Sequence, residues 1–394
     1  MITDPQLHDS DSKPFDDSYD QQFVDISDIH RKHSAPLNSA TGTLVTGASG
    51  YLGVHIVSEL WHKHSGDIWC LVRSREKFNT YLTRYTQISP NDPRLHILFG
   101  DVSAENFGLD ATELENLFSC IHAIIHCAAS VSFFGDWERI RKINHLGTCH
   151  AIQLAERWHA KLHHISTLTV SGDLLVRQQT AHAQFSEKQL FIGQAYQDNV
   201  YVHSKYLAER EIIQAIRDNR INASIYRVAN LTWRLSDGLF QPNYKENDLY
   251  NITTTLLNLG TQPQETYDEN LELIPVDECS ASICAVLDHS DNLVLHLYSG
   301  NSVTAGHYLQ TLGIKSTVPY SDFIQALFLR HDDPARFTLM YLAGIKTDVF
   351  NSIVAFDNRF TSEVLLDSGF EWKPIPDDYI KEILRFEKKE GNVL

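Results

Sequence analysis

The chain has 394 residues, 43% of them hydrophobic and 21% charged, which is ordinary globular composition and enough for one large domain or two smaller ones. Its net charge of −17 argues against nucleic acid as a partner, because phosphate backbones require a basic face. No apolar run approaches the ~20 residues of a membrane span. The six cysteines show no spacing typical of disulfides or metal sites. We therefore expect a reduced, cytoplasmic protein that binds neither membranes nor metals.

The first 40 residues differ from the rest in composition. They carry eight aspartates and three basic residues, with few apolar side chains. Such a segment buries too little apolar surface to fold alone. We predict a flexible acidic leader or linker over residues 1–40, within which the short segment 23–29 can pack on the body.

From Thr43 onward, apolar strands alternate with helices. The first strand leads through glycines into a helix in which Leu52, Ile56, Val57 and Leu60 share one face. Further buried strands are predicted at 68–74, 94–103, 120–130, 161–172 and 223–231, with helices notably at 139–158 and 201–217. The alternation predicts an α/β fold, a Rossmann-type doubly wound parallel sheet over residues 41–235.

After Trp233 the strand–helix alternation weakens. Residues 236–394 are predicted to form mainly a smaller, helical C-terminal substrate lobe. Segment 293–300 is an exception, because its apolar run predicts a strand that returns to the sheet. The helices expected in the lobe lie near 247–259, 320–330, 336–342 and 379–388.

The glycines Gly47, Gly50 and Gly53 stand between the first strand and the first helix. In a dinucleotide-binding loop the first glycine permits the tight turn, the second lets the backbone approach a pyrophosphate, and the third lets helix pack on strand. Arg73 and Arg75 follow the second strand, where no acidic residue stands. Arginine at this point suits a 2′-phosphate, whereas an acidic residue binds the ribose of NAD. NADP(H) is therefore the predicted cofactor.

A Tyr201-x-x-x-Lys205 pair begins a predicted helix, so the two side chains face the same way. Lys205 can hold the nicotinamide ribose and favour the tyrosinate, while Tyr201 donates a proton to a carbonyl oxygen. Thr167, at the end of the fifth strand, is the hydroxyl expected on the same oxygen, with Ser166 as the fallback. Asn144 is expected to anchor a helix kink or a water relay, with a purely structural amide as the alternative.

With these residues placed, the sequence resembles extended short-chain dehydrogenases/reductases. More closely, it is similar to the terminal thioester reductase domains of non-ribosomal peptide synthetases and carboxylic acid reductases. The segments that carry the resemblance run from about 43 to 285 and include VTGASGYLGVHIVSEL, CLVRS, GDVS, HISTLTVSGD and DNVYVHSKYLAERE. The long insert between Thr167 and Tyr201 also looks like that group.

The resemblance implies reductive release of an acyl or peptidyl thioester from the phosphopantetheine of a carrier protein, which acts in cis upstream or in trans. The product would be an aldehyde, or an alcohol after a second hydride. Carried over by position, the residues that would line the pyrophosphate are Gly47, Ser49, Gly50, Tyr51 and Leu52. Those implied near the adenine are Asp101 and Val102, and those near the nicotinamide are Ala128, Ala129, Ser130 and Val228.

Three alternatives remain open at this point. A nucleotide-sugar epimerase or dehydratase shares the fold, but it would want NAD and an acidic residue in place of Arg73. A fatty acyl-CoA reductase differs mainly in what carries the acyl chain. A non-catalytic dinucleotide sensor has no need of Thr167, Tyr201 and Lys205 together.

Overall fold

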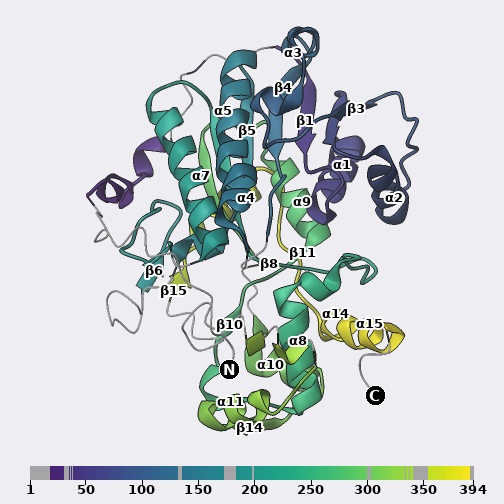
Figure 1. Cartoon of the computed structure of the whole chain (residues 1–394), viewed down its shortest axis with the longest axis vertical. Helices are drawn as coiled ribbons and strands as arrows, with labels where there is room; N and C mark the ends of the chain where they lie inside the picture. The colour runs from purple at the N-terminus through teal and green to yellow at the C-terminus, as the bar shows by residue number, and fades with distance from the viewer. Residues whose placement is uncertain are drawn as a thin grey trace, which may run out of the picture.

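The computed structural model describes residues 18–30, 35, 37, 39–131, 135–172, 183–197, 199–299, 303–332, 334–336, 338–339 and 354–390. Its centre is a seven-stranded parallel sheet with helices on both faces (Figure 1). The strand order is β12-β7-β5-β4-β1-β2-β3, which confirms the predicted Rossmann-type sheet. The strands are β1 (Gly42–Thr46), β2 (Ile68–Val72), β3 (Leu95–Phe99), β4 (Ile121–His126), β5 (Lys161–Thr167), β7 (Ala223–Val228) and β12 (Leu293–Leu297).

Two apolar layers hold the sheet between its helices. One layer joins it to α1 (Tyr51–Lys63), α2 (Arg75–Tyr85) and α9 (Val276–Ala285), and it continues into the lobe. The other joins it to α3 (Ala111–Phe118), α5 (Gly147–Trp158) and α7 (Val200–Arg217). Because both faces are covered, every residue of β1, β5, β7 and β12 is buried. The predicted apolar face of the first helix is buried as well.

Several elements end earlier than the sequence pattern predicts. The fifth strand stops at Thr167 and continues as the 3-10 helix η5 (Leu168–Ser171). The expected helix 139–158 is three pieces: α4 (Trp137–Arg141), a π-helical turn η4 (Lys142–Leu146) and α5. The third strand is likewise followed by η3 (Glu105–Gly108). Apolar periodicity alone does not register such changes of helix type.

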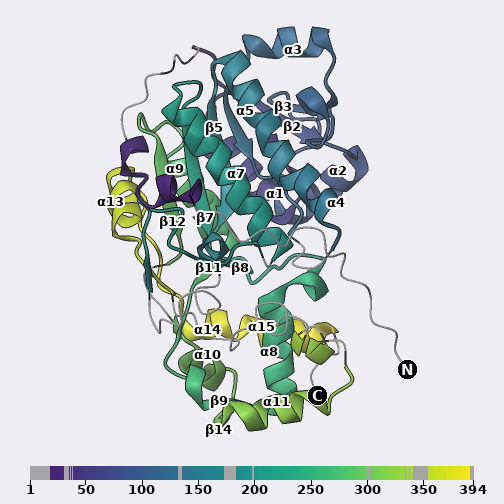
Figure 2. The ribbon, with the colours of Figure 1, turned by 60° about the vertical axis from the view of Figure 1, so that its left-hand side comes forward.

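The smaller lobe, predicted to bind the substrate, lies beyond the carboxyl edge of the sheet (Figure 2). Its helices are α8 (Asp248–Leu259), α10 (Ala305–Thr311), α11 (Tyr320–Phe328), α14 (Asp377–Ile380) and α15 (Glu382–Glu390), with the 3-10 turns η6 (Tyr244–Glu246) and η7 (Gln264–Thr266). Most of the expected helix 336–342 lies outside the described residues. The lobe is not one block of sequence, because β12 returns to the sheet as predicted and α13 (Arg359–Asp367) packs against it.

Four two-stranded sheets join segments that are distant in the chain. The lobe contains β9 (Thr261–Pro263) with β14 (Ser316–Val318), and β10 (Asn270–Leu271) with β13 (Val303–Thr304). At the junction with the main sheet lie β8 (Asn230–Thr232) with β11 (Leu273–Pro275), and β6 (Ala183–Phe185) with β15 (Val354–Phe356). The predicted sixth strand, 223–231, therefore divides between two sheets at Ala229.

Residues 20–29 pack against α7, as the sequence suggested for segment 23–29. They form two 3-10 turns, η1 (Asp20–Phe23) and η2 (Ser27–Ile29), and Phe23 and Ile26 are fully buried. The Arg217 guanidinium, on α7, donates to both carboxylate oxygens of Asp28 at 3.0 and 2.9 Å. This part of the acidic leader thus belongs to the folded body. Among the described residues, no helix is long and apolar enough to cross a bilayer.

A buried ion pair ties α7 to the sheet. The Arg227 guanidinium on β7 donates to the Glu209 carboxylate on α7 through three contacts of 2.7 to 3.1 Å, and both side chains are fully buried. Ser166 donates its hydroxyl to the same carboxylate, and Arg227 also contacts Nε2 of His296 at 3.1 Å. In an apolar interior, such a pair must stay intact, because a lone buried charge is very costly.

We predict that Glu209→Gln destabilises the protein by about 3–5 kcal/mol, because it leaves the Arg227 charge buried without its partner. Urea unfolding followed by circular dichroism measures the free energy of unfolding. Glu211→Gln on the same helix is the matched control. Because the Glu211 carboxylate is more exposed, this substitution should lower the free energy of unfolding by less than about 1 kcal/mol. Equal unfolding midpoints for Glu209→Gln and the wild type would contradict the assignment.

Candidate functional site

The loop 47–50 turns the chain from β1 into α1. Gly47 has φ +71°, and a Cβ there would approach the backbone nitrogen of Ala128 to 2.7 Å. A Cβ on Gly53 would overlap the carbonyl oxygen of Gly47. Gly50 is the N-cap of α1 and offers no side-chain cap, so the amides of the first turn are available to an external anion. The tight turn at Gly47 and the close packing at Gly53 match the sequence-based expectation, and the approach of a pyrophosphate at Gly50 stays a prediction.

The side chain of Tyr51 does not face this loop. It is buried, its ring packs edge-on against Tyr85 and Phe240, and its hydroxyl donates to the carbonyl oxygens of Thr232 and Leu239 at 3.2 and 3.0 Å. Leu52 is also buried in the core, whereas Ser49 is half-buried at the loop. Any part that residues 51 and 52 play in binding a phosphate therefore belongs to their backbone amides.

Arg73 and Arg75 lie at the end of β2 and the start of α2, where the sequence predicted a 2′-phosphate site. The Arg73 side chain is 75% exposed, and its guanidinium is 3.8 Å from the Asp101 carboxylate. Asp101 accepts hydrogen bonds from the amide and hydroxyl of Ser103, at 2.9 and 2.7 Å. Arg75 stacks over the exposed ring of Phe99. An acidic residue therefore does stand near Arg73, contributed by the segment after β3 rather than by the end of β2.

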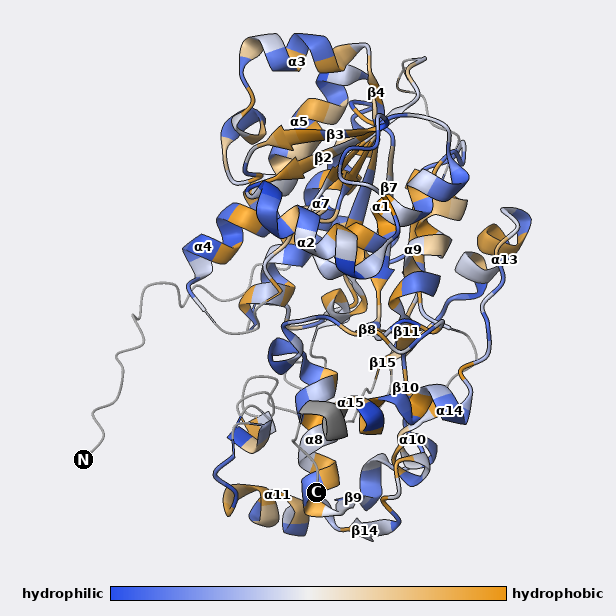
Figure 3. Ribbon diagram, turned by 90° about the vertical axis from the view of Figure 1, so that its right-hand side faces the viewer, coloured by the Kyte–Doolittle hydropathy of each residue, from blue (hydrophilic) through white to orange (hydrophobic). Residues whose placement is uncertain are grey.

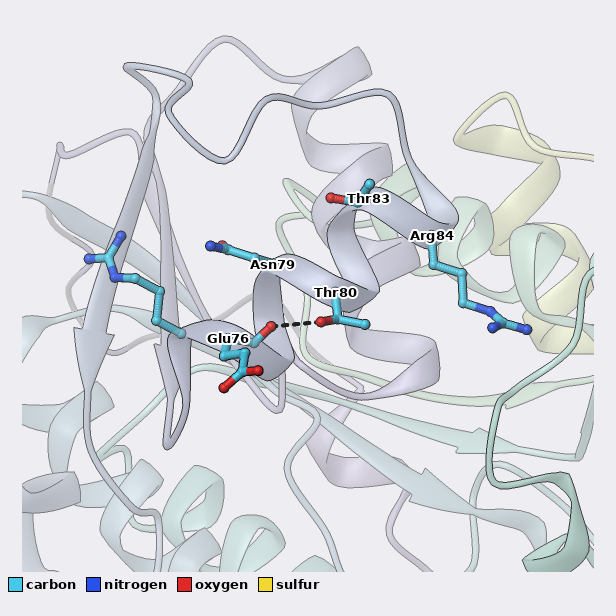
Figure 4. Close-up of a pocket in the computed structure, with 6 residues that line it drawn as sticks. Glu76, Asn79, Thr80, Thr83 and Arg84 are labelled. Atoms are coloured by element: carbon cyan, nitrogen blue, oxygen red, sulfur yellow. Dashed lines mark hydrogen bonds between the residues drawn. The ribbon is translucent and has the colours of Figure 1, made fainter.

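A hollow of about 800 Å³ lies along the same helix (Figure 4). Its lining residues all belong to α2: Arg75, Glu76, Asn79, Thr80, Thr83 and Arg84. The Thr80 hydroxyl donates a hydrogen bond to the carbonyl oxygen of Glu76 at 2.9 Å. The hollow shares only Arg75 with the predicted cofactor site, and we assign it no role in that site.

Asn144 holds the loop after β4, on the predicted nicotinamide side. Its Oδ1 accepts from the amide of Ser130 at 2.8 Å, and its Nδ2 donates to the carbonyl oxygen of Ser130 and the hydroxyl of Ser204, both at 2.9 Å. Asn144 sits in the π-helical turn η4 and is 1% exposed. The structure thus favours the predicted anchor at a helix irregularity, with the amide fully engaged. Ala128, just before this loop, is fixed by its amide, which donates to the Thr46 hydroxyl at 3.1 Å.

Tyr201 and Thr167 meet at the carboxyl edge of the sheet. Thr167 ends β5, directly beside Val228 at the end of β7. Asn199 caps α7 by accepting from the amides of Tyr201 and Val202 at 3.0 and 3.1 Å, which sets the direction of the first turn. Burial raises the pKa of the Tyr201 phenol, and its hydrogen bond with the Thr167 side chain lowers that pKa in part. The phenol is therefore protonated at neutral pH and can donate.

Ser166 points elsewhere. Its hydroxyl is bound to the Glu209 carboxylate in the buried ion pair, so it is not free for a substrate. The Thr167 hydroxyl instead lies within reach of Tyr201 and of the Thr169 hydroxyl, the latter at 2.9 Å. The geometry supports Thr167 over the fallback.

Lys205 lies one turn after Tyr201, and its ammonium donates to the carbonyl oxygen of Ile165 at 2.7 Å. Only 3% of the residue is exposed, and burial lowers its pKa to about 8. Electrostatic interactions with Cys127, directly after β4, and with Glu209 raise the pKa of Lys205 in part. The hydrogen bond to Ile165 therefore fixes the Lys205 ammonium against the end of β5, which also carries Thr167.

Three residues of this region escaped the sequence-based predictions: Ser204, Glu209 and Asp248. The Ser204 hydroxyl accepts a hydrogen bond from Asn144, and the Glu209 carboxylate accepts one from the Ser166 hydroxyl. Asp248 begins α8 of the lobe and interacts electrostatically with Tyr201. Helical spacing was a usable signal for the first two, since Ser204 follows Tyr201 by three residues and Glu209 follows Lys205 by four. Asp248 carries no such signal, because it comes from another part of the fold.

An NAD-binding family model described as "Male sterility protein" matches residues 45–283, more than half of the chain. The chain belongs to the male sterility protein family. This places it among extended short-chain dehydrogenases/reductases, as the resemblance implied. The matched range runs from β1 to α9 and so contains every predicted catalytic and cofactor-binding residue.

Two relatives of this chain are multidomain peptide synthetases. A linear gramicidin synthase polypeptide of Brevibacillus parabrevis is 28% identical over 273 residues, 66% of this chain and 5% of that protein. The hybrid PKS-NRPS synthetase xenE of Xenoacremonium sinensis is 27% identical over 316 residues, 78% of this chain and 7% of that protein. The chain thus spans only 5% and 7% of the length of these relatives.

The fold is that of known reductase domains. The reductase domain of the aureusimine biosynthetic cluster superposes with a TM-score of 0.78 at 21% identity, covering 95% of this chain and 99% of that one. The terminal R domain of the myxalamid PKS-NRPS pathway gives a TM-score of 0.77 at 24% identity, covering 95% and 98%. At these coverages the likeness includes the lobe as well as the sheet.

We predict that Asn144→Ala loosens the loop 128–130 and costs about 3 kcal/mol, because three buried hydrogen bonds are lost at about 1 kcal/mol each. Hydrogen exchange at the Ser130 amide should accelerate strongly. Ser204→Ala is the matched control, since it removes one of the three bonds and leaves Ser130 paired. Unchanged exchange in Asn144→Ala would show that other contacts hold the loop.

Proposed function

We propose that the protein is an NADP(H)-dependent reductase that releases an acyl or peptidyl group from a carrier-protein thioester as an aldehyde, or as an alcohol after a second reduction. The observation that carries this proposal is the meeting of the Tyr201 and Thr167 hydroxyls at the carboxyl edge of the sheet, with the Lys205 ammonium held nearby on β5 by the carbonyl oxygen of Ile165. Ligands in open α/β sheets bind at this edge.

The residues around the loop suit an NADP(H) molecule. The uncapped first turn of α1 would offer its amides to a pyrophosphate, and the close backbone approaches at Gly47 and Gly53 exclude side chains at those two positions. Arg73 and Arg75 would hold the 2′-phosphate, and Asp101 and Val102 would lie by the adenine. Ala128, Ala129, Ser130 and Val228 would border the nicotinamide. When bound, the reduced nicotinamide supplies the hydride.

The chain's own residues handle the oxygen of the substrate. Tyr201 donates its proton to the thioester carbonyl oxygen as negative charge develops there, and the Thr167 hydroxyl donates a hydrogen bond to the same atom. The Lys205 ammonium stabilises the phenolate that remains on Tyr201 and would hold the nicotinamide ribose. The tetrahedral product then loses its thiol to give the aldehyde.

The choice of a thioester rests on two kinds of support. The curated relatives are peptide synthetases and hybrid PKS-NRPS synthetases, whose intermediates we take to be carrier-bound thioesters. The reductase domain of the aureusimine cluster superposes with a TM-score of 0.78 at 21% identity, whereas UDP-glucose 4-epimerase from Thermotoga maritima gives 0.58 at 16% identity. The partner we propose is an acyl or peptidyl carrier protein, in cis or in trans.

We predict that Arg73→Ala weakens NADPH binding by roughly 10- to 100-fold and leaves NADH binding unchanged, because only NADPH presents a 2′-phosphate to the guanidinium. Titration of cofactor fluorescence gives both dissociation constants without a substrate. Arg84→Ala, on the far end of α2, is the control and should change neither constant. Equal losses for both cofactors in Arg73→Ala would argue against a 2′-phosphate contact.

We predict that Tyr201→Phe lowers kcat/KM for an acyl-pantetheine thioester by about 10²–10⁴-fold, because the proton donor is lost. NADPH oxidation is the assay, and NADPH binding should persist. Thr167→Ala should also lower the rate, whereas Ser166→Ala should not, since the Ser166 hydroxyl serves Glu209. A near wild-type rate in Tyr201→Phe would refute the mechanism.

A further inference from the structure

A crossing segment, residues 232–240, carries the chain from β8 at the edge of the sheet into the lobe. It begins four residues after Val228, which lies beside Thr167 in the sheet, and α8 follows it. The amide of Arg234 donates to the carbonyl oxygen of Leu239 at 3.0 Å, so the segment folds back on itself. Figure 1 shows it between the helices α1 and α2 beside the sheet and α8 of the lobe. Its position therefore bears on where the lobe stands relative to the edge that carries Thr167.

Tyr51 holds both ends of the crossing segment. Its hydroxyl faces the carbonyl oxygens of Thr232 and Leu239 at 3.2 and 3.0 Å. A phenol has one proton to donate, so the two carbonyl groups share it. Burial raises the pKa of the Tyr51 phenol, which therefore stays protonated and remains a donor. The ring packs edge-on against Phe240, with 5.9 Å between the ring centroids. One side chain thus fixes the segment by polar and apolar contacts together.

The same residue opens the helix at the predicted pyrophosphate site. Helix α1 begins at Tyr51, directly after Gly50, which provides no side-chain cap. The amides of this first turn have no acceptor within the helix, and the Tyr51 amide is one of them. A pyrophosphate bound there would accept from the backbone of the residue whose side chain holds the crossing segment. Tyr51 therefore belongs both to the cofactor loop and to the junction with the lobe.

We propose that Tyr51 is a positioning residue that couples occupancy of the cofactor site to the placement of the lobe, and thereby to binding of the thioester. The inference rests on the proposed NADP(H)-dependent thioester reduction. A pyrophosphate on the first turn of α1 would restrain Tyr51, and the restrained phenol would hold the crossing segment in one position. A thioester that binds to this ordered lobe loses less conformational entropy, so the cofactor strengthens its binding.

Tyr85 offers a matched comparison. It is buried, its ring centroid is 5.5 Å from that of Tyr51, and its hydroxyl donates to the carbonyl oxygen of Phe240 at 2.8 Å. Loss of this hydroxyl also removes a hydrogen bond to the crossing segment. Tyr85 is, however, the last residue of α2 and not part of the turn that follows the glycine loop. Only the Tyr51 phenol should therefore transmit the presence of a cofactor.

The test compares Tyr51→Phe and Tyr85→Phe with the wild type, because each variant keeps its ring and loses only the hydroxyl. Isothermal titration calorimetry measures the Kd of an acyl-pantetheine thioester with and without saturating NADP⁺. The oxidised cofactor carries no hydride to donate, so no turnover occurs during the titration. The Kd of NADP⁺ alone is measured for all three proteins, and urea unfolding confirms that each is folded.

For the wild type we expect NADP⁺ to lower the Kd of the thioester at least about fivefold. In Tyr51→Phe the two Kd values should agree within about twofold, while the Kd of NADP⁺ alone stays within about threefold of the wild type. Tyr85→Phe should keep the wild-type ratio. No effect of NADP⁺ in the wild type, a retained effect in Tyr51→Phe, or an equal loss in both variants would overturn the assignment. A wild type that fails to bind NADP⁺ or the thioester would instead refute the proposed function.

Discussion

The site depends on the buried ion pair between Glu209 and Arg227. Both side chains are fully enclosed, so the pair must form wherever the sheet and α7 pack together. Its carboxylate also takes up the Ser166 hydroxyl, which leaves Thr167 as the hydroxyl of β5 that is available at the sheet edge. One interaction thereby sets the distance of α7 from the sheet and decides which of two adjacent hydroxyls can meet a substrate.

The apolar side of α7 packs on the sheet, whose strands are mostly hydrophobic in Figure 3, and the helix is also held from two further directions. Asn144, in its π-helical turn, joins α7 through Ser204 to the backbone of Ser130, so hydrogen bonds connect the helix carrying Tyr201 with the loop bordering the predicted nicotinamide site. On its outer side, α7 meets residues 20–29, where Arg217 binds Asp28. Rigid support of this kind is what a proton donor needs, because small misplacements at the reacting atom reduce rates strongly.

The sequence predicted those parts of the site that depend on local rules. The glycine loop, the alternation of strands with helices and the helix that carries Tyr201 and Lys205 follow from short-range spacing, and the structure contains all three. Local sequence patterns could not decide between Ser166 and Thr167, because the carboxylate that binds the Ser166 hydroxyl belongs to Glu209, 43 residues away in the chain. The break of the helix near Asn144 and the inward side chain of Tyr51 likewise follow from tertiary contacts, which periodicity does not report.

The net charge of −17 is compatible with an anionic cofactor, because binding is decided over short distances. At physiological ionic strength, charges beyond about 8 Å are largely screened. Within that range the predicted phosphate positions meet Arg73, Arg75 and the N-terminus of α1, all positive. Asp101, 3.8 Å from Arg73, is the local exception, and it offsets part of the attraction that a 2′-phosphate would feel. Discrimination between NADPH and NADH therefore depends on how far the guanidinium turns from Asp101 to the phosphate, which exposure of its side chain allows.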